Sequence, residues 1–185
     1  MTLDFRKNHN HRQFTHCPSC GHPGLTRDSI KSFCCKTCGF LFFLNCAAAA
    51  MALIIDDKNQ LLVTRRKYDP ARGSLDLPGG FTEPGDGIEE SLKREIKEEL
   101  NLEVTGLSYL CSFPNLYPYR SVTYPITDMA FTCRVNGFDD IRSGDDVTGF
   151  EFIPIPELAP GLFGMASARK VIQYLKCRGC DARGM

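Results

Sequence analysis

The fold is decided by the segment GGFTEPGDGIEESLKREIKEELNL, residues 79–102, in which a glycine-rich turn leads into an acidic stretch. Apolar side chains recur every four residues over Ile88–Leu100, which predicts an amphipathic helix that begins at about Gly87. Asp86 is predicted to cap the first turn by accepting a hydrogen bond from a free backbone N–H group. Asn101 is predicted to end the helix in the left-handed conformation that glycine usually adopts there.

Three acidic residues of this predicted helix, Glu95, Glu98 and Glu99, are spaced so that their side chains face one another. Glu95 and Glu99 have no basic residue three or four positions away, and Glu99 falls among the apolar positions of the helical wheel. Packing carboxylates beside apolar residues is costly unless a positive charge lies among them. Hard oxygen ligands at this spacing favour Mg²⁺ or Mn²⁺, and the alternative is a solvated acidic face.

Four cysteines near the N-terminus form two copies of the pattern Cys-x-x-Cys-Gly. Each pair can bring two thiolates to one tetrahedral ion, and the following glycine permits a tight turn around the metal. Two such pairs complete a closed coordination shell, which argues for a structural rather than a catalytic ion. We therefore predict a structural zinc on Cys17, Cys20, Cys35 and Cys38.

The number of cysteines and the N-terminal sequence together indicate the cellular compartment. The chain has ten cysteines, and its polar N-terminus has no apolar core of the secretory type, which predicts a reducing, cytoplasmic location. A third Cys-x-x-Cys pair, Cys177 and Cys180, has no partner pair nearby in the sequence. We interpret this pair as loose surface thiols, with a redox or metal role as the alternative.

The rest of the chain predicts an α/β protein. An apolar stretch over residues 40–55 is interrupted by Asn45 and is short for a membrane span, so two strands are expected there. Strands and helices then alternate, which favours layers around one core. The expected elements are a hairpin of residues 51–55 and 60–67, strands at 103–113, 122–135 and 147–155, and a closing helix at 166–176.

The net charge of the chain gives no sign of a charged partner. Lys and Arg balance Asp and Glu at 22 each, so no net field directs the protein to nucleic acid or to an anionic membrane.

Four segments are predicted along the chain. The expected segments are a mobile N-terminal tail at 1–16, a zinc ribbon at 17–44, a main domain at 45–176 and a C-terminal tail at 177–185.

Residues 80–102 resemble the Nudix box, a long ordered pattern of glycine, glutamate and Arg-Glu residues. Two positions depart from it, because Asp86 stands where the family has Glu and Asn101 stands where it has Gly. With the flanking residues the resemblance extends over about 45–176. The matching positions are Gly80, Arg94, Glu95, Ile96, Glu98, Glu99 and Leu102.

The resemblance implies an α/β/α sandwich with a mixed sheet and metal-dependent hydrolysis of a diphosphate. It implies that Glu95, Glu98 and Glu99 hold Mg²⁺ or Mn²⁺ and that Arg94 orients a glutamate. Further metal ligands implied by the resemblance are the carbonyl of Gly80, or of its neighbour, and a later acid, best matched by Asp146. The alternative for Asp146 is an ordinary turn acid.

The substrate is less closely specified. A four-cysteine ribbon before a Nudix domain resembles the NADH pyrophosphatases, and the stretch at 112–120 matches their further motif in part. We expect a nucleotide such as NADH, NAD or ADP-ribose; no nucleic-acid or membrane partner is expected, and a homodimer is left open. The alternatives are cleansing of nucleoside triphosphates and a non-catalytic zinc-ribbon binding module. The aromatic residues that could stack on a base, or equally serve as core and dimer contacts, are Phe113, Tyr117, Tyr119 and Tyr124.

Overall fold

The computed structural model describes residues 13–144 and 146–181, and these form two compact units. The small unit holds the chain up to Ala47 together with Leu116–Ile126, and the large unit holds Ala48–Asn115 and the chain from Thr127 onward. Most of the predicted mobile tail, residues 1–12, lies outside the described residues.

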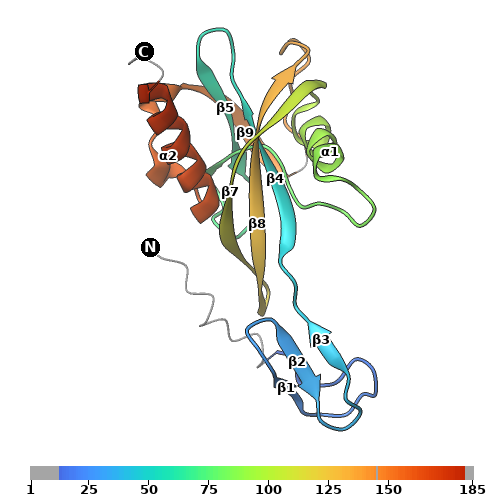
Figure 1. Ribbon diagram of the computed structural model, residues 1–185. Coiled ribbons are helices and arrows are strands. Elements are labelled where there is room, and N and C mark those ends of the chain that lie inside the picture. Colours follow the sequence, from blue (N-terminus) through green and yellow to red (C-terminus); the bar gives the residue numbers. More distant parts are fainter. Residues whose placement is uncertain (1–12, 145, 182–185) are drawn as a thin grey trace. The chain divides into compact units, whose positions relative to one another are not determined.

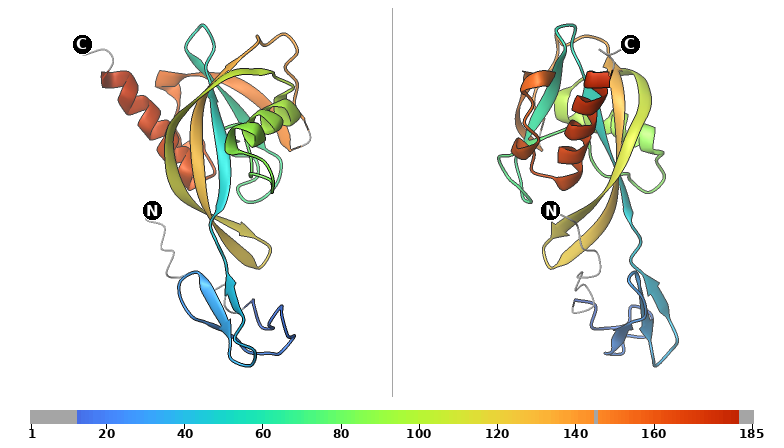
Figure 2. Two further views of the ribbon diagram at one scale, coloured as in Figure 1. Left: turned by 45° about the vertical axis from the view of Figure 1, so that its right-hand side comes forward. Right: turned by 60° about the vertical axis from the view of Figure 1, so that its left-hand side comes forward.

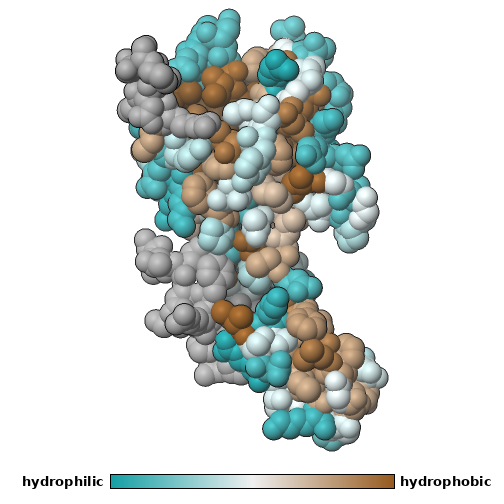
Figure 3. All heavy atoms as spheres, viewed as in Figure 1, coloured by the Kyte–Doolittle hydropathy of each residue, from teal (hydrophilic) through white to brown (hydrophobic). Residues whose placement is uncertain are grey.

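The small unit contains a three-stranded antiparallel sheet in the order β1-β2-β3. The ring of Phe14 packs against those of Phe33 and Phe42, with centroids 5.2 and 5.4 Å apart. Apolar residues also remain on the surface of this unit, as the brown spheres of Figure 3 show, and Leu41 and Phe43 are 41% and 46% exposed. A unit this small buries few apolar residues, chiefly Leu25 and Phe33, so we expect its folding to need a further crosslink. The strands are β1 (Leu25–Arg27), β2 (Ser32–Cys35) and β3 (Leu41–Phe43).

The large unit is built on two three-stranded sheets, in the orders β4-β8-β7 and β6-β5-β9. Helices α1 and α2 lie on opposite sides of these strands (Figures 1 and 2). Two short 3-10 helices, η3 (Ile155–Glu157) and η4 (Pro160–Leu162), precede α2. The main elements are β4 (Ala47–Ile54), β5 (Gln60–Arg66), β6 (Leu75–Asp76), α1 (Ile88–Leu100), β7 (Val104–Tyr119), β8 (Val122–Val135), β9 (Val147–Pro154) and α2 (Ala166–Asp181).

The core of the large unit forms where α1 packs on the strands. Leu92, Ile96 and Leu100, one turn apart on α1, are fully buried in a cluster with Ile54 of β4 and Leu62 of β5. Burial of one such side chain contributes about 1.5–3 kcal/mol. The predicted amphipathic helix and the α/β fold class are therefore confirmed.

The predicted hairpin of residues 51–55 and 60–67 is wrong in its pairing. The segments β4 and β5 belong to different sheets, and only an isolated bridge joins Ile55 to Leu61. The turn between them is closed by Asp56 N–H donating to Gln60 O over 3.0 Å, with Asn59 in a left-handed conformation at φ 60°. Buried strands lack the alternation that identifies a partner, so adjacency in sequence was a misleading guide.

The N-terminal end of α1 differs from the prediction, and the C-terminal end agrees with it. Gly87, rather than Asp86, is the N-cap, and its N–H donates to the Glu90 carboxylate over 3.0 Å. Asp86 instead accepts a hydrogen bond from the Ser91 hydroxyl over 3.4 Å. Asn101 ends α1 at φ 56° and ψ 28°, the predicted left-handed conformation.

The apolar stretch at 40–55 forms two strands, as predicted, with Asn45 in the link between β3 and β4. Within residues 13–144 and 146–181, no helix combines the length and the apolar character needed to cross a membrane.

Candidate functional site

The glycine turn before α1 lies directly beside strand β4. Residues 78–82 follow β4 with strand-like hydrogen bonds, and Ala50 N–H donates to the Gly80 carbonyl over 2.9 Å. Gly79 has φ 137°, and a Cβ atom there would collide with the Ala50 carbonyl oxygen. The turn therefore needs glycine for both conformation and space.

The second glycine of the turn makes room for a carboxylate. A Cβ atom on Gly80 would lie 2.6 Å from the Glu95 carboxylate carbon, so Glu95 rests against bare backbone. The Glu95 side chain is 17% exposed. The carbonyl oxygen of Gly80 accepts a hydrogen bond from Ala50 N–H, but its second lone pair can still coordinate a cation.

Arg94 gathers four carboxylates. Its Nη1 lies 3.0 Å from Glu95 Oε1 and 3.2 Å from Glu98 Oε2. Its Nε lies 3.7 Å from Asp86, and its Nη2 lies 3.7 Å from Glu83. Burial lowers the pKa of Arg94, but the charges of Glu95 and Glu83 outweigh this and raise it. One guanidinium cannot neutralise four acids, so the cluster retains negative charge that suits a cation.

The two half-buried glutamates have perturbed acidities. Burial raises the pKa of Glu99 to about 8, against the opposing effect of the hydrogen bond from Gly79 N–H. The charges of Glu95 and Asp146 raise it further. Burial likewise raises the pKa of Glu95, while Arg94 lowers it. Glu99 is thus largely protonated at neutral pH unless a positive charge joins the cluster.

The glutamates converge less tightly than the cysteines do. Among the described residues, the four cysteines alone form a group of at least three metal-ligating side chains with all ligand atoms within 4.8 Å of one another. The Glu98 side chain is 60% exposed and is paired with Arg94. The donor set around Glu95 and Glu99 consists of hard oxygens beside a glycine turn, which fits Mg²⁺ or Mn²⁺.

Asp146 lies immediately before β9 and is exposed. Its charge raises the pKa of both Glu95 and Glu99, in addition to the larger effect of burial, which places it near them. Its own backbone carbonyl accepts a hydrogen bond from Lys67 N–H over 3.3 Å. The neighbouring residue 145 lies outside the described residues.

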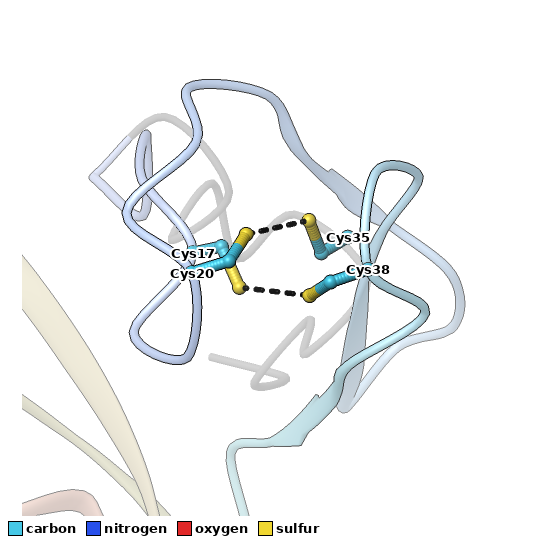
Figure 4. A group of neighbouring side chains, drawn as sticks. All are labelled: Cys17, Cys20, Cys35 and Cys38. Carbon is cyan, nitrogen blue, oxygen red and sulfur yellow. Dashed lines mark hydrogen bonds between the residues drawn. The ribbon is translucent and has the colours of Figure 1, made fainter.

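The four cysteines of the small unit form one cluster (Figure 4). The Sγ atoms of Cys17 and Cys38 lie 3.7 Å apart, and those of Cys20 and Cys35 lie 3.8 Å apart. A tetrahedral zinc with bonds of about 2.3 Å would set its sulfurs about 3.8 Å apart.

Each cysteine pair sits on the same kind of turn. Gly21 N–H donates to Cys17 O, and Gly39 N–H donates to Cys35 O, both over 2.9 Å. Both glycines have positive φ, at 69° and 76°. A backbone hydrogen bond at Cys38 lowers the pKa of the Cys35 thiol to about 6. A backbone hydrogen bond at His22 lowers the pKa of Cys20, but the neighbouring thiols outweigh it and raise that pKa to about 12, so without a metal the cluster favours the thiolate at Cys35 over that at Cys20.

The predicted aromatic residues are divided between the units. Phe113 is half-buried on β7 in the large unit, where Lys170 Nζ of α2 lies 5.6 Å from its ring centroid. Tyr117 and Tyr119 belong to the small unit, and Tyr119 is 54% exposed. Of the third cysteine pair, Cys177 is exposed, and the side chain of residue 180 lies outside the described part.

One acidic residue near the site, Asp76, was not predicted from the sequence. Asp76 of β6 pairs with Arg66 over 2.6 Å, and its side chain is only 14% exposed. Its charge contributes to the raised pKa of Glu99, behind burial and the charge of Glu95. The sequence does hold a signal for this residue: Asp76 stands between Leu75 and Leu77 just before the glycine turn, a pattern that indicates an acid within a buried strand.

Comparisons with known proteins identify the family and the fold of the chain. Residues 46–175 match the family model described as NUDIX domain. An ADP-ribose pyrophosphatase from Methanocaldococcus jannaschii is 36% identical over 113 residues, covering 60% of this chain and 64% of that protein. An NAD-capped RNA hydrolase from Pseudomonas putida is 24% identical over 172 residues, covering 92% of this chain and 59% of that protein. The chain thus spans about three fifths of the length of these relatives.

A solved structure shares the fold. The crystal structure of a NUDIX hydrolase from Nitrosomonas europaea superposes with a TM-score of 0.64 at 18% identity. The superposition covers 89% of this chain and 92% of that one.

Proposed function

Since the chain belongs to the NUDIX domain family, we propose that it hydrolyses the diphosphate linkage of a nucleotide derivative with the help of Mg²⁺ or Mn²⁺. The observation that carries this proposal is the packing of the glycine turn on α1. It holds the side chains of Glu95 and Glu99 half-buried, with Arg94 paired to Glu95 and a backbone N–H of the turn bonded to Glu99. Such an arrangement is costly in a protein that does not bind a cation there.

The proposed ligands are the three glutamates, with Asp146 and the Gly80 carbonyl completing the set. A bound divalent ion neutralises the phosphate oxygens and lowers the pKa of water. Glu99 must give up its proton to become a ligand, because its pKa lies near 8 without the ion. The role proposed for Arg94 is to orient Glu95 and Glu98, both of which its Nη1 contacts.

We propose an ADP-containing substrate, with NADH, NAD and ADP-ribose as the candidates. The names of the two relatives support this choice, since ADP-ribose and NAD share the ADP group. Phe113, which lies in the same unit as the glutamates, is the proposed stacking residue for the base. Tyr117 and Tyr119 belong to the other unit, so no shared base site is proposed for them. The cysteine cluster is proposed to hold a structural zinc, because its sulfur spacing fits that ion.

The test is a panel assay with ADP-ribose, NADH, NAD, a diadenosine polyphosphate and nucleoside triphosphates, each with Mg²⁺ or Mn²⁺. Two monophosphates as products, such as AMP and ribose 5-phosphate from ADP-ribose, would support the proposal. Release of pyrophosphate from a triphosphate in preference to all others would replace it with nucleotide cleansing. Failure to hydrolyse any compound would favour the binding-module alternative.

A further inference from the structure

Residues 140–144, which lie between β8 and β9, cover the C-terminal end of α1. The carbonyls in the last turn of a helix have no partner within it. Two of them are satisfied from this segment: Gly144 N–H donates to Glu99 O over 2.7 Å, and Arg142 N–H donates to Leu100 O over 3.1 Å. The carbonyl that accepts the hydrogen bond from Gly144 therefore belongs to Glu99, and the side chain of Glu99 lies in the candidate site.

The contact at Gly144 requires glycine. A Cβ atom there would collide with the Glu98 carbonyl oxygen, and it would lie 3.0 Å from the Glu98 carbonyl carbon and 3.2 Å from Glu99 Cα. These are backbone atoms of a helix whose apolar face is packed in the core, so they cannot move aside as the tip of a side chain can. The requirement comes from close approach rather than from an unusual backbone angle, because Gly144 has no positive φ.

The same segment is held at two further points. Asn101 Nδ2 donates to the Asp140 carbonyl over 3.0 Å, which fixes the start of the segment on the end of α1. On the other side of Gly144, the carbonyl of Asp146 accepts from Lys67 N–H over 3.3 Å, just beyond β5. The described residues on the two sides of residue 145, Gly144 and Asp146, are thus each held by a backbone hydrogen bond, and Asp146 is exposed.

We propose that Gly144 is a positioning residue, which sets the Asp146 carboxylate beside Glu95 and Glu99 by allowing its segment to lie directly on the last turn of α1. This inference rests on the proposed function, because it treats Asp146 as a ligand of the same cation. It assigns to Gly144 no contact with substrate or metal. Its effect is transmitted through the position of one carboxylate.

The test is Mn²⁺ binding, followed by electron paramagnetic resonance of the free ion, in the full chain with its cysteine site loaded with zinc. Gly144→Ala should weaken Mn²⁺ binding by roughly 10- to 100-fold, the usual cost of losing a group that orients a metal ligand. Gly149→Ala is the matched control, since a Cβ atom there meets nothing within 4 Å and its φ is ordinary. The control should bind Mn²⁺ as the unchanged protein does.

A double-mutant cycle separates positioning from general damage to α1. In an Asp146→Asn background, Gly144→Ala should cause no further loss of Mn²⁺ affinity, because the carboxylate that it positions is already gone. An equal loss in both backgrounds would overturn the inference, as would an Asp146→Asn variant with unchanged Mn²⁺ affinity. If Gly144→Ala does not fold, Asn101→Gly takes its place in the cycle, since glycine keeps the left-handed helix end and removes the hydrogen bond to Asp140. It should weaken Mn²⁺ binding in the unchanged protein and cause no further loss in Asp146→Asn.

The inference and the proposed function fail in different ways. Unchanged protein that binds no Mn²⁺ would overturn both. Strong Mn²⁺ binding that depends on Glu98 but not on Asp146 would overturn only the inference.

Discussion

The backbone N–H of Gly79 donates a hydrogen bond to Glu99 Oε2 over 3.1 Å, joining the glycine turn to the last turn of α1. A single N–H group does not offset the burial of that carboxylate, and the pKa of Glu99 is raised to about 8. The turn thus holds in place a group that is costly to ionise until a cation arrives.

The first prediction concerns pH and the stability of the metal-free protein. A carboxyl group whose pKa rises from 4.5 to about 8 on folding binds its proton more tightly in the folded state. Its stabilising effect is complete below about pH 4.5 and is lost as the pH rises towards 8. With EDTA present, the free energy of unfolding in urea should fall more steeply over this range than in Glu99→Gln. Equal slopes in the two proteins would show that Glu99 is not perturbed.

The second prediction concerns the space left by Gly80. The three atoms nearest to a Cβ atom there all belong to the Glu95 carboxylate, the end of a flexible side chain that can move at little cost. Gly80→Ala should therefore change the melting temperature little but weaken Mn²⁺ binding and slow hydrolysis. Gly161→Ala is the control, because its Cβ would enter open space. Unimpaired Mn²⁺ binding in Gly80→Ala would mean that the position of Glu95 is unimportant.

The third prediction concerns the cysteine cluster. Cys17→Ser removes one of four thiolates, so the protein should lose its zinc, and the small unit should become more open to hydrogen exchange. Leu92, Ile96 and the rest of the α1 core lie in the other unit and should keep their protection. Elemental analysis and hydrogen exchange check the two parts, and one full equivalent of zinc in Cys17→Ser would refute the assignment.

The elements that sequence reasoning predicted well have a strong local signal. The four-residue apolar repeat of α1 and the left-handed end at Asn101 depend on neighbouring residues alone. The two Cys-x-x-Cys-Gly turns likewise carry their own geometry, and the structure brings their sulfurs together.

What the sequence could not supply depends on distant residues. Strand β5 pairs with β9, so Leu62 lies opposite Phe152, 90 positions along the chain, and two buried runs give no sign of this choice. Which glutamate Arg94 would contact also depended on the fold, and in the structure its Nη1 bonds Glu95 and Glu98, while Glu90 accepts a hydrogen bond from the N–H of the N-cap residue Gly87. The cap itself moved by one residue, since glycine and aspartate both suit that position.

The central claim is that the acidic face of α1 holds the cation that hydrolysis needs, and Glu98→Gln tests it most directly. Glu98 is 60% exposed, and its surface pair with Arg94 is worth at most about 1 kcal/mol, so folding should be preserved. Glu89→Gln, the same change at an exposed position of the first turn, is the matched control.

The measurement is turnover of the best substrate from the panel, across a titration of Mg²⁺ and of Mn²⁺, for the unchanged protein and both variants. We predict that Glu98→Gln lowers turnover by at least about 100-fold at limiting metal, while Glu89→Gln does not. Full turnover by Glu98→Gln at limiting metal would contradict the account, because the acidic face would then be only a solvated surface.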